Sequence, residues 1–161
     1  MQQPLEWRDA FSVAQPALDA EHREIVDAIT RIAESSDTPD PACLRPLLCA
    51  LKEKAASHFA HEDAMLREIL AFTASARGTQ KFLAAMSEAL IDDHLAGHAN
   101  AAKILDDMIR DTLREKSCRV DALVDRLVHW FVDHAVKHDA HLKTLFQTID
   151  SDCPDLLARL D

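Results

Sequence analysis

Nine histidines stand out in this chain of 161 residues, because several of them lie where an apolar helical stripe should continue. His58 and Glu62, for example, are four residues apart, so on a helix they share one face. Burying an imidazole or a carboxylate without a partner costs free energy, so such positions require an explanation. Seven side chains have this property: His22, His58, Glu62, His94, His98, His134 and Asp139.

This set of side chains predicts a metal centre. A single interior histidine is more often a hydrogen-bonded core residue, but here four separate segments each contribute to one interior. Imidazole and carboxylate together suit iron or zinc, and seven such donors exceed the needs of one ion. Two metals bridged by carboxylates are the simplest solution. A ferritin-like centre is excluded, because no histidine has a glutamate three residues before it.

The apolar spacing predicts four long helices that would position these side chains. We expect them over 19–35, with Asp19 as the N-cap, and over 41–76, 79–115 and 119–147. Short connections between long helices predict an all-α, up-down-up-down antiparallel four-helix bundle. The predicted single domain, 1–161, consists of an N-terminal arm (1–18), the bundle (19–147) and a C-terminal tail (148–161) that adds a helical turn.

Composition narrows the function. Two glycines and no tyrosine are a poor supply for a β-sandwich or barrel. The formal charge of −10 disfavours nucleic acid and anionic lipid as partners. The four cysteines form no C-x-x-C pair, and there is neither a signal peptide nor an apolar run long enough to span a membrane. We therefore expect a soluble, cytoplasmic protein.

The ordered motifs along the chain resemble those of the bacterial hemerythrin family. They are W-x-x-x-F-S-V from Trp7 followed by L-D-A-E-H up to His22, H-F-A-H-E-D from His58, H-x-x-x-H from His94, and W-F-V-D-H-A-V-K-H-D from Trp130. Each motif alone is weak, but their order is specific. The resemblance implies that His22, His58, Glu62, His94, His98, His134 and Asp139 hold two iron ions in an oxo- or hydroxo-bridged, non-haem di-iron centre.

The resemblance also implies a function, the reversible binding of dioxygen by a carrier, store or sensor that is not an enzyme. In the family, His94, His98 and His134 saturate one iron, while His22 and His58 leave a position open on the other. Trp130, Phe131 and Ala135 are then expected to line the oxygen pocket. The alternatives are a di-iron peroxidase or nitric-oxide-handling enzyme, for which His61 and Asp63 are candidate acids, and a sensory or interaction module of a larger signalling protein.

The segment 63–93 is longer than the family usually has. We expect it to extend the second and third helices as a projecting hairpin. The hairpin would carry apolar side chains that need cover, which makes a homodimer through it one interpretation and packing within the chain the other. These side chains are Phe72, Phe82, Leu83 and Met86.

The last helix departs from the family pattern at two points. Ala135 replaces a usual isoleucine and could open the oxygen pocket, which Phe131 could refill. On α-helical spacing, His138 shares the face of His134 better than Asp139 does, since five residues correspond to a rotation of about 140°. The resemblance instead favours Asp139 as the ligand, because a carboxylate can bridge two irons, and leaves His138 beside the ligands. No metal role is expected for the other three histidines, His61, His129 and His141.

Overall fold

The computed structural model describes residues 5–35, 41–74, 88–114, 119–152 and 155–156. All regular elements in these ranges are helical, which confirms the all-α prediction. Their bounds are η1 (Asp9–Phe11), α1 (Pro16–Glu34), α2 (Pro41–Ala74), α4 (Glu88–Arg114), α5 (Val120–Asp133), η3 (His134–His138) and α6 (Ala140–Asp152).

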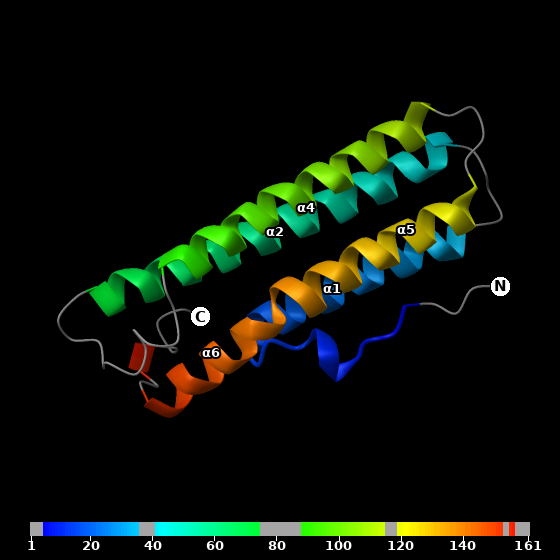
Figure 1. The fold of residues 1–161 in the computed structure, drawn as a ribbon. Coiled ribbons are helices and arrows are strands. Elements are labelled where there is room, and N and C mark those ends of the chain that lie inside the picture. The colour runs from blue at the N-terminus through cyan, green and yellow to red at the C-terminus, as the bar shows by residue number, and fades with distance from the viewer. Residues whose placement is uncertain (1–4, 36–40, 75–87, 115–118, 153–154, 157–161) are drawn as a thin grey trace.

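The helices form a bundle of four long rods, the fourth made of α5, η3 and α6 in succession (Figure 1). Rods that follow one another in the sequence run in opposite directions (Figure 1). α1 packs against α2 and α5, and α4 packs against the same two helices. The rods therefore enclose a common interior, to which each can contribute side chains.

The first helix begins three residues before its predicted start at 19. Pro16 occupies its first turn, where a missing N–H costs nothing, and the Gln15 side chain accepts hydrogen bonds from the next turn. The prediction of Asp19 as the N-cap is wrong. Asp19 instead accepts hydrogen bonds from the Ser12 hydroxyl at 2.7 Å and the Val13 N–H at 2.8 Å, so it fastens the N-terminal arm to α1.

The predicted single helix over 119–147 is wrong in its interior and at its end. α5 ends at Asp133, η3 is a π-helical segment, and α6 continues to Asp152, past the predicted boundary with the tail. In η3 the Asp139 N–H donates to the His134 carbonyl at 3.3 Å, a bond that spans five residues. Such a wider turn is rare and is found mostly at functional sites.

The central helices agree with prediction where the structure describes them. α2 extends from Pro41 to Ala74 and α4 from Glu88 to Arg114. The predicted hairpin tip falls between them, so Phe82, Leu83 and Met86 lie outside the described residues. Phe72 is half-buried against a core cluster of its own chain.

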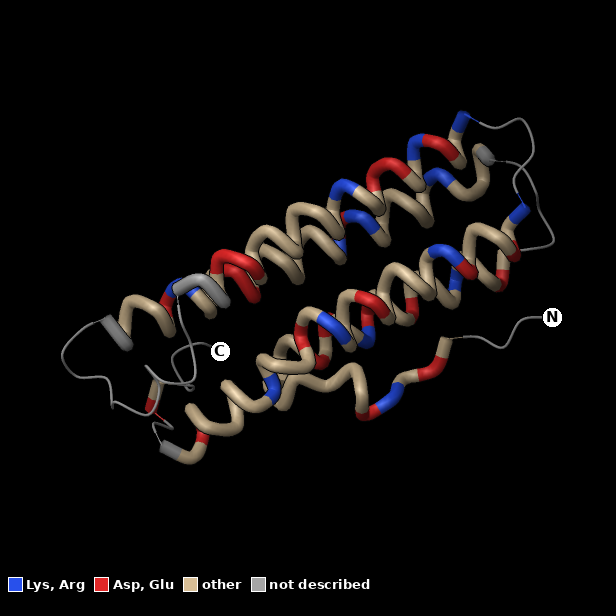
Figure 2. The backbone as a smooth tube through the Cα atoms, in the orientation of Figure 1, with Lys and Arg blue, Asp and Glu red and all other residues tan. Residues whose placement is uncertain are grey.

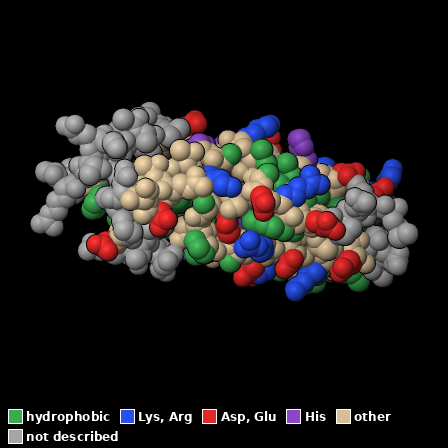
Figure 3. All heavy atoms as spheres, turned by 90° about the horizontal axis from the view of Figure 1, so that it is seen from below, with side chains coloured by type: hydrophobic (Ala, Val, Ile, Leu, Met, Phe, Trp, Pro, Cys, Tyr) green, Lys and Arg blue, Asp and Glu red, His purple; other side chains and the backbone are tan. Residues whose placement is uncertain are grey.

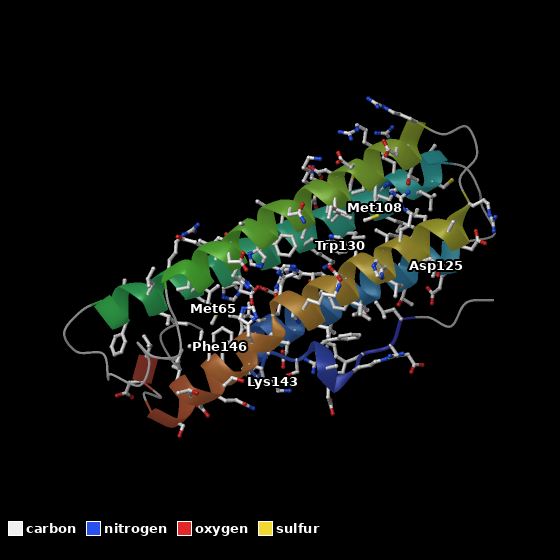
Figure 4. All side chains as sticks on the ribbon, in the orientation of Figure 1. Met65, Met108, Asp125, Trp130, Lys143 and Phe146 are labelled. Atoms are coloured by element: carbon white, nitrogen blue, oxygen red, sulfur yellow. The ribbon has the colours of Figure 1, made fainter. Side chains whose placement is uncertain are left out.

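Two apolar cores occupy the interior of the bundle, and Figure 4 labels two residues of each. One core includes Met108 and Trp130, and the other includes Met65 and Phe146. Along every rod, the polar side chains singled out above lie between residues of the first core and residues of the second. The bundle thus holds a polar layer between two dry layers.

The outer surface carries mixed charge. Acidic and basic residues are intermixed along the rods (Figure 2), and on the face in Figure 3 they are interspersed with apolar side chains. Within the described part of the chain, no helix is both long and apolar enough to span a membrane.

Candidate metal centre

The structure brings all seven predicted side chains into one buried cluster. None of them exceeds 4% relative exposure, and four are fully buried. α1 supplies His22, α2 supplies His58 and Glu62, α4 supplies His94 and His98, and the last rod supplies His134 and Asp139.

The five imidazoles direct the same ring nitrogen, Nε2, toward the middle of the cluster. His22 Nε2 and His58 Nε2 are 3.0 Å apart. Donor atoms that occupy neighbouring positions around one octahedral metal ion, each about 2.1 Å from it, are separated by about 3 Å. The spacing of these nitrogens is therefore that of ligands to a common ion.

The two carboxylates lie between the imidazoles. Glu62 Oε2 is 3.0 Å from His98 Nε2, 3.4 Å from His94 Nε2 and 3.7 Å from His58 Nε2. Glu62 therefore reaches helix α4 as well as its own helix.

Asp139 spans the cluster in the same way from the last rod. Its Oδ2 is 3.4 Å from His22 Nε2 and 3.3 Å from His134 Nε2, while Oδ1 is 3.9 Å from His94 Nε2. Each carboxylate thus lies near one member of the pair His22 and His58, and near two of the histidines that α4 and η3 supply. This is the placement that two bridging groups require.

Three of the imidazoles are held from behind by their outer nitrogen, Nδ1. His22 donates to the Phe11 carbonyl at 2.7 Å and His58 donates to Glu21 Oε2 at 3.1 Å. His98 donates to Asp63 Oδ1 at 2.5 Å. A proton fixed on Nδ1 leaves Nε2 with a free lone pair, and such outer hydrogen bonds are typical of metal-ligating histidines.

Several buried atoms of the cluster have no hydrogen-bond partner among the described residues, although buried polar groups are nearly always paired. They are Glu62 Oε1, both ring nitrogens of His94, both ring nitrogens of His134 and both carboxylate oxygens of Asp139. Metal ions at the centre would satisfy the carboxylate oxygens and the Nε2 atoms together. Two sets of four donors meet the distance requirement for an ion: His58, Glu62, His134 and Asp139, and Glu62, His94, His98 and Asp139.

The protonation states of Glu62 and His134 also favour cation binding. Burial alone would raise the pKa of Glu62, but the nearby imidazoles of His94 and His98 hold that pKa well below its usual range, so the group is a carboxylate. Burial lowers the pKa of His134 to about 4, which keeps its imidazole neutral near pH 7. Anionic carboxylates and neutral imidazoles are the forms that bind metal.

The π-helical segment decides between His138 and Asp139. The wider turn adds a residue between His134 and the next position on the same face, so Asp139 enters the cluster. The argument from α-helical spacing, which favoured His138, is therefore wrong. His138 stacks on the outer side of the His134 ring, with centroids 5.9 Å apart, and it lies over Gly97, where a Cβ would come within 3.0 Å of its ring.

The other histidines lie outside the cluster. His129 and His141 are exposed, and His61 donates to Glu21 Oε1 at 2.8 Å. Sequence reasoning missed the groups that hold the imidazoles, namely Glu21, Asp63 and the Phe11 carbonyl. Glu21 directly precedes a histidine of the cluster and Asp63 follows Glu62, but both positions are typical of surface charges.

Aromatic side chains surround the cluster. Phe59 stacks on His98 at 4.6 Å between centroids and meets the edge of His134 at 4.8 Å. Phe131, predicted for the oxygen pocket, packs edge-on against His22 at 5.8 Å, and Ala135 is fully buried. Trp130 is buried one helical turn before His134, and its Nε1 donates to the Ala101 carbonyl.

Comparison with known families gives one match. The model of the hemerythrin HHE cation binding domain matches residues 13–146, which include all seven side chains of the cluster. Comparison with curated proteins and comparison with solved structures give no match.

Proposed function

From the premise that this chain belongs to the hemerythrin family of HHE cation-binding domains, we propose that it binds dioxygen reversibly at a di-iron centre. The ligands would be His22, His58, Glu62, His94, His98, His134 and Asp139. The observation that carries the proposal is the convergence of these buried donors, with the carboxylates placed between the two groups of imidazoles. A carrier, a store or a sensor would use the same site.

The number of donors supports two ions with one free position. Five imidazoles supply five donors, two bridging carboxylates supply four, and a bridging oxo or hydroxo ion supplies two. Two six-coordinate ions therefore keep one position for a small exogenous ligand. Two irons held by these residues would supply the electrons that bind dioxygen and would regain them on its release.

The residues of this chain keep water and protons away from that position. The imidazoles of His22 and His58, which would leave the position open, are fully buried, and the Phe131 ring covers the edge of His22. The Phe11 ring packs in turn against Phe131, with centroids 5.2 Å apart. A dry surrounding of this kind favours release of the ligand unchanged over its protonation and reduction.

The enzymatic alternative requires an acid that is free to deliver protons. Both candidates from the sequence are engaged in hydrogen bonds: His61 donates to Glu21, and Asp63 accepts from His98. These contacts favour a positioning role for both residues, and hence ligand binding over turnover.

Iron quantitation combined with optical spectra tests the proposal. We expect two irons per chain and, on admission of air to the reduced protein, a visible absorption band that disappears on deoxygenation. Zinc alone, or no bound metal, would contradict the centre. Steady consumption of added peroxide would move the assignment to the enzyme.

Ligand variants locate the site. His58→Ala should lose iron, whereas the matched control His129→Ala, which removes an exposed histidine outside the cluster, should keep the full content. Full iron in His58→Ala would show that the metal lies elsewhere.

A further inference from the structure

Gly97 lies inside α4, where a glycine is not expected. Glycine loses more backbone entropy on folding than alanine does, so it destabilises the interior of a helix. The φ angle of Gly97 is not positive, so its backbone conformation does not require glycine either. What this position requires is therefore the absence of a Cβ.

The missing Cβ makes room for the ring of His138. A Cβ on Gly97 would lie 3.0 Å from His138 Nδ1 and 3.3 Å from its Cε1, closer than the optimal separation of nonbonded atoms. The three nearest heavy atoms that this Cβ would meet all belong to the same ring. Gly97 thus forms a notch on α4, and the half-buried His138 of η3 is seated in it.

The notch lies at one end of a groove between α4 and the last rod. The groove has a volume of about 500 Å³ and extends from Met108 and Asp125, which Figure 4 labels, to Gly97 and His138. His134, a proposed iron ligand, also lines it. However, the Nδ1 atom of His134 is buried and has no hydrogen-bond partner among the described residues. A contact other than a hydrogen bond must therefore shield this imidazole from the solvent in the groove.

The ring contacts of His134 indicate which residue provides the shield. Its imidazole packs against the rings of four neighbours: His58, Phe59, His98 and His138. Of these four, His138 alone lines the groove. The rings of His134 and His138 are stacked, 28° from parallel and with centroids 5.9 Å apart. His138 is therefore placed between the groove and the ligand.

We propose that His138 is a positioning residue that closes the groove against the metal centre. Its ring, seated at Gly97, orients the His134 imidazole and keeps water and dissolved chelators from it. The stacked ring takes the place of the outer hydrogen bond that His134 lacks. In the iron-loaded protein this cover slows the loss of the ion that His134 binds. Only this last consequence rests on the proposed function.

Chemical modification of the metal-free protein tests the cover without iron. Diethyl pyrocarbonate transfers an ethoxycarbonyl group to an accessible imidazole nitrogen, and mass spectrometry of tryptic peptides locates the product. In the wild type, we expect the exposed His129 to react and the buried His134 to be protected. In His138→Ala, His134 should react about tenfold faster, which corresponds to the loss of one ring contact and of the apolar area beneath it.

His22 is the internal control for general loss of structure. It is fully buried and lies outside the lining of the groove. If His138 only stabilises the fold, His22 and His134 should become reactive together in His138→Ala. If His138 covers His134, the protection of His22 should be unchanged.

Two further variants separate the ring of His138 from its chemistry and from the groove. His138→Phe keeps a flat ring without nitrogen atoms and should restore the protection of His134. Asn100→Ala removes another side chain of the groove lining, an exposed one on α4, and should leave His134 as protected as in the wild type.

Gly97→Ala tests the notch. The added Cβ displaces the His138 ring, so the reactivity of His134 should rise, but less than in His138→Ala because the ring is shifted and not removed. In the His138→Ala background, Gly97→Ala should have no further effect, since the ring that it would displace is absent.

Iron release tests the consequence for the metal centre. His138→Ala should take up two irons, as the wild type does, but lose iron to a chelator faster, on the order of tenfold. His138→Phe should release iron at the rate of the wild type. Equal rates for His138→Ala and the wild type would contradict the effect of the cover on the metal.

Three results of the modification experiment would overturn the cover itself: equal reactivity of His134 in the wild type and His138→Ala, no restored protection in His138→Phe, or an equal effect of Gly97→Ala in both backgrounds. Failure of the proposed function gives a different result. A chain that takes up no iron, but in which protection of His134 depends on His138, retains the cover and contradicts the metal centre.

Discussion

The two sides of the polar cluster are built differently. On one side, His22, His58 and His98 are each held by an outer hydrogen bond, and every acceptor of these bonds comes from the first 63 residues of the chain. In the other set, the Nδ1 atoms of His94 and His134 have no hydrogen-bond partner among the described residues. We call these two sets, which differ in their hydrogen bonds and not in their position, the held side and the open side.

The difference indicates that the imidazoles of the cluster are not equally fixed in orientation. Outer hydrogen bonds fix the orientation and the proton of an imidazole, so the held side is preorganised for metal. On the open side, His134 is the first residue of the π-helical segment, and its Nδ1 has no such hydrogen bond among the described residues.

The largest expected effect comes from the carboxylate of the open side. Asp139→Ala removes the carboxylate by which the last rod reaches His22 of α1 and His94 of α4, so we expect loss of at least one of the two proposed irons. His138→Ala, which removes the neighbouring ring outside the cluster, should retain both. Iron content after desalting measures the two variants, and the opposite pattern would restore His138 as the ligand.

The same pair of residues shows what the sequence could predict. On α1, α2 and α4 the polar residues follow regular helical spacing, so hydrophobic periodicity alone placed them in the interior correctly. In the last rod, a π-helical hydrogen bond spanning five residues replaces the α-helical bond spanning four, and the apolar pattern does not predict this change. There the residue that the structure places in the cluster is the one favoured by the family resemblance, Asp139, and not the one favoured by α-helical geometry.

The groups that accept hydrogen bonds from the Nδ1 atoms were not predictable either, for a different reason. Glu21 and Asp63 are charged residues on the outer part of their helices, and Phe11 acts through its backbone carbonyl. Side-chain patterns carry no signal for a carbonyl. For the two carboxylates, the partner histidine lies on another helix, and the relative rotation of two packed helices is not encoded in the period of either.

Acid titration of the metal-free protein should distinguish His134 of the open side from His98 of the held side, because their contributions to stability change with pH in opposite directions. Burial lowers the pKa of His134 to about 4, below the unfolded value of 6.5, so its contribution to stability is present above pH 6.5 and is lost as the pH falls toward 4. Burial also lowers the pKa of His98, but its hydrogen bonds with Glu62 and Asp63 outweigh this and raise it above 6.5. The contribution of His98 is therefore complete below pH 6.5 and is lost as the pH rises through the folded-state pKa.

Urea unfolding between pH 4 and 8 measures these contributions. His134→Gln should reduce the loss of stability between pH 6.5 and 4 by on the order of 3 kcal/mol. The wild type should lose stability as the pH rises above 6.5, and this loss should be absent from His98→Gln. Equal pH profiles for the two variants would contradict the distinction between the sides.

Removing one outer hydrogen bond of the held side should lower the metal affinity without abolishing metal binding. Glu21→Ala frees His58 Nδ1, and losses of this kind cost about 10- to 100-fold in metal affinity. Glu24→Ala is the control, because it removes a carboxylate of the same helix that pairs with Lys54 instead. Competition with a chelator measures both affinities, and an unchanged value for Glu21→Ala would mean that the support is dispensable.

The smallest expected effect concerns the backbone of the N-terminal arm, which brings the Phe11 carbonyl to His22. Ala14 has a φ of 59°, a left-handed conformation that costs a residue with a Cβ about 1–2 kcal/mol. Glycine relieves this cost but loses more entropy on folding, so Ala14→Gly should stabilise the protein by about 1 kcal/mol or less. Ala60→Gly, at an exposed position inside α2, should destabilise it by about as much. Urea unfolding of the two variants compares them directly, and a loss of stability in both would mean that the arm is not strained at Ala14.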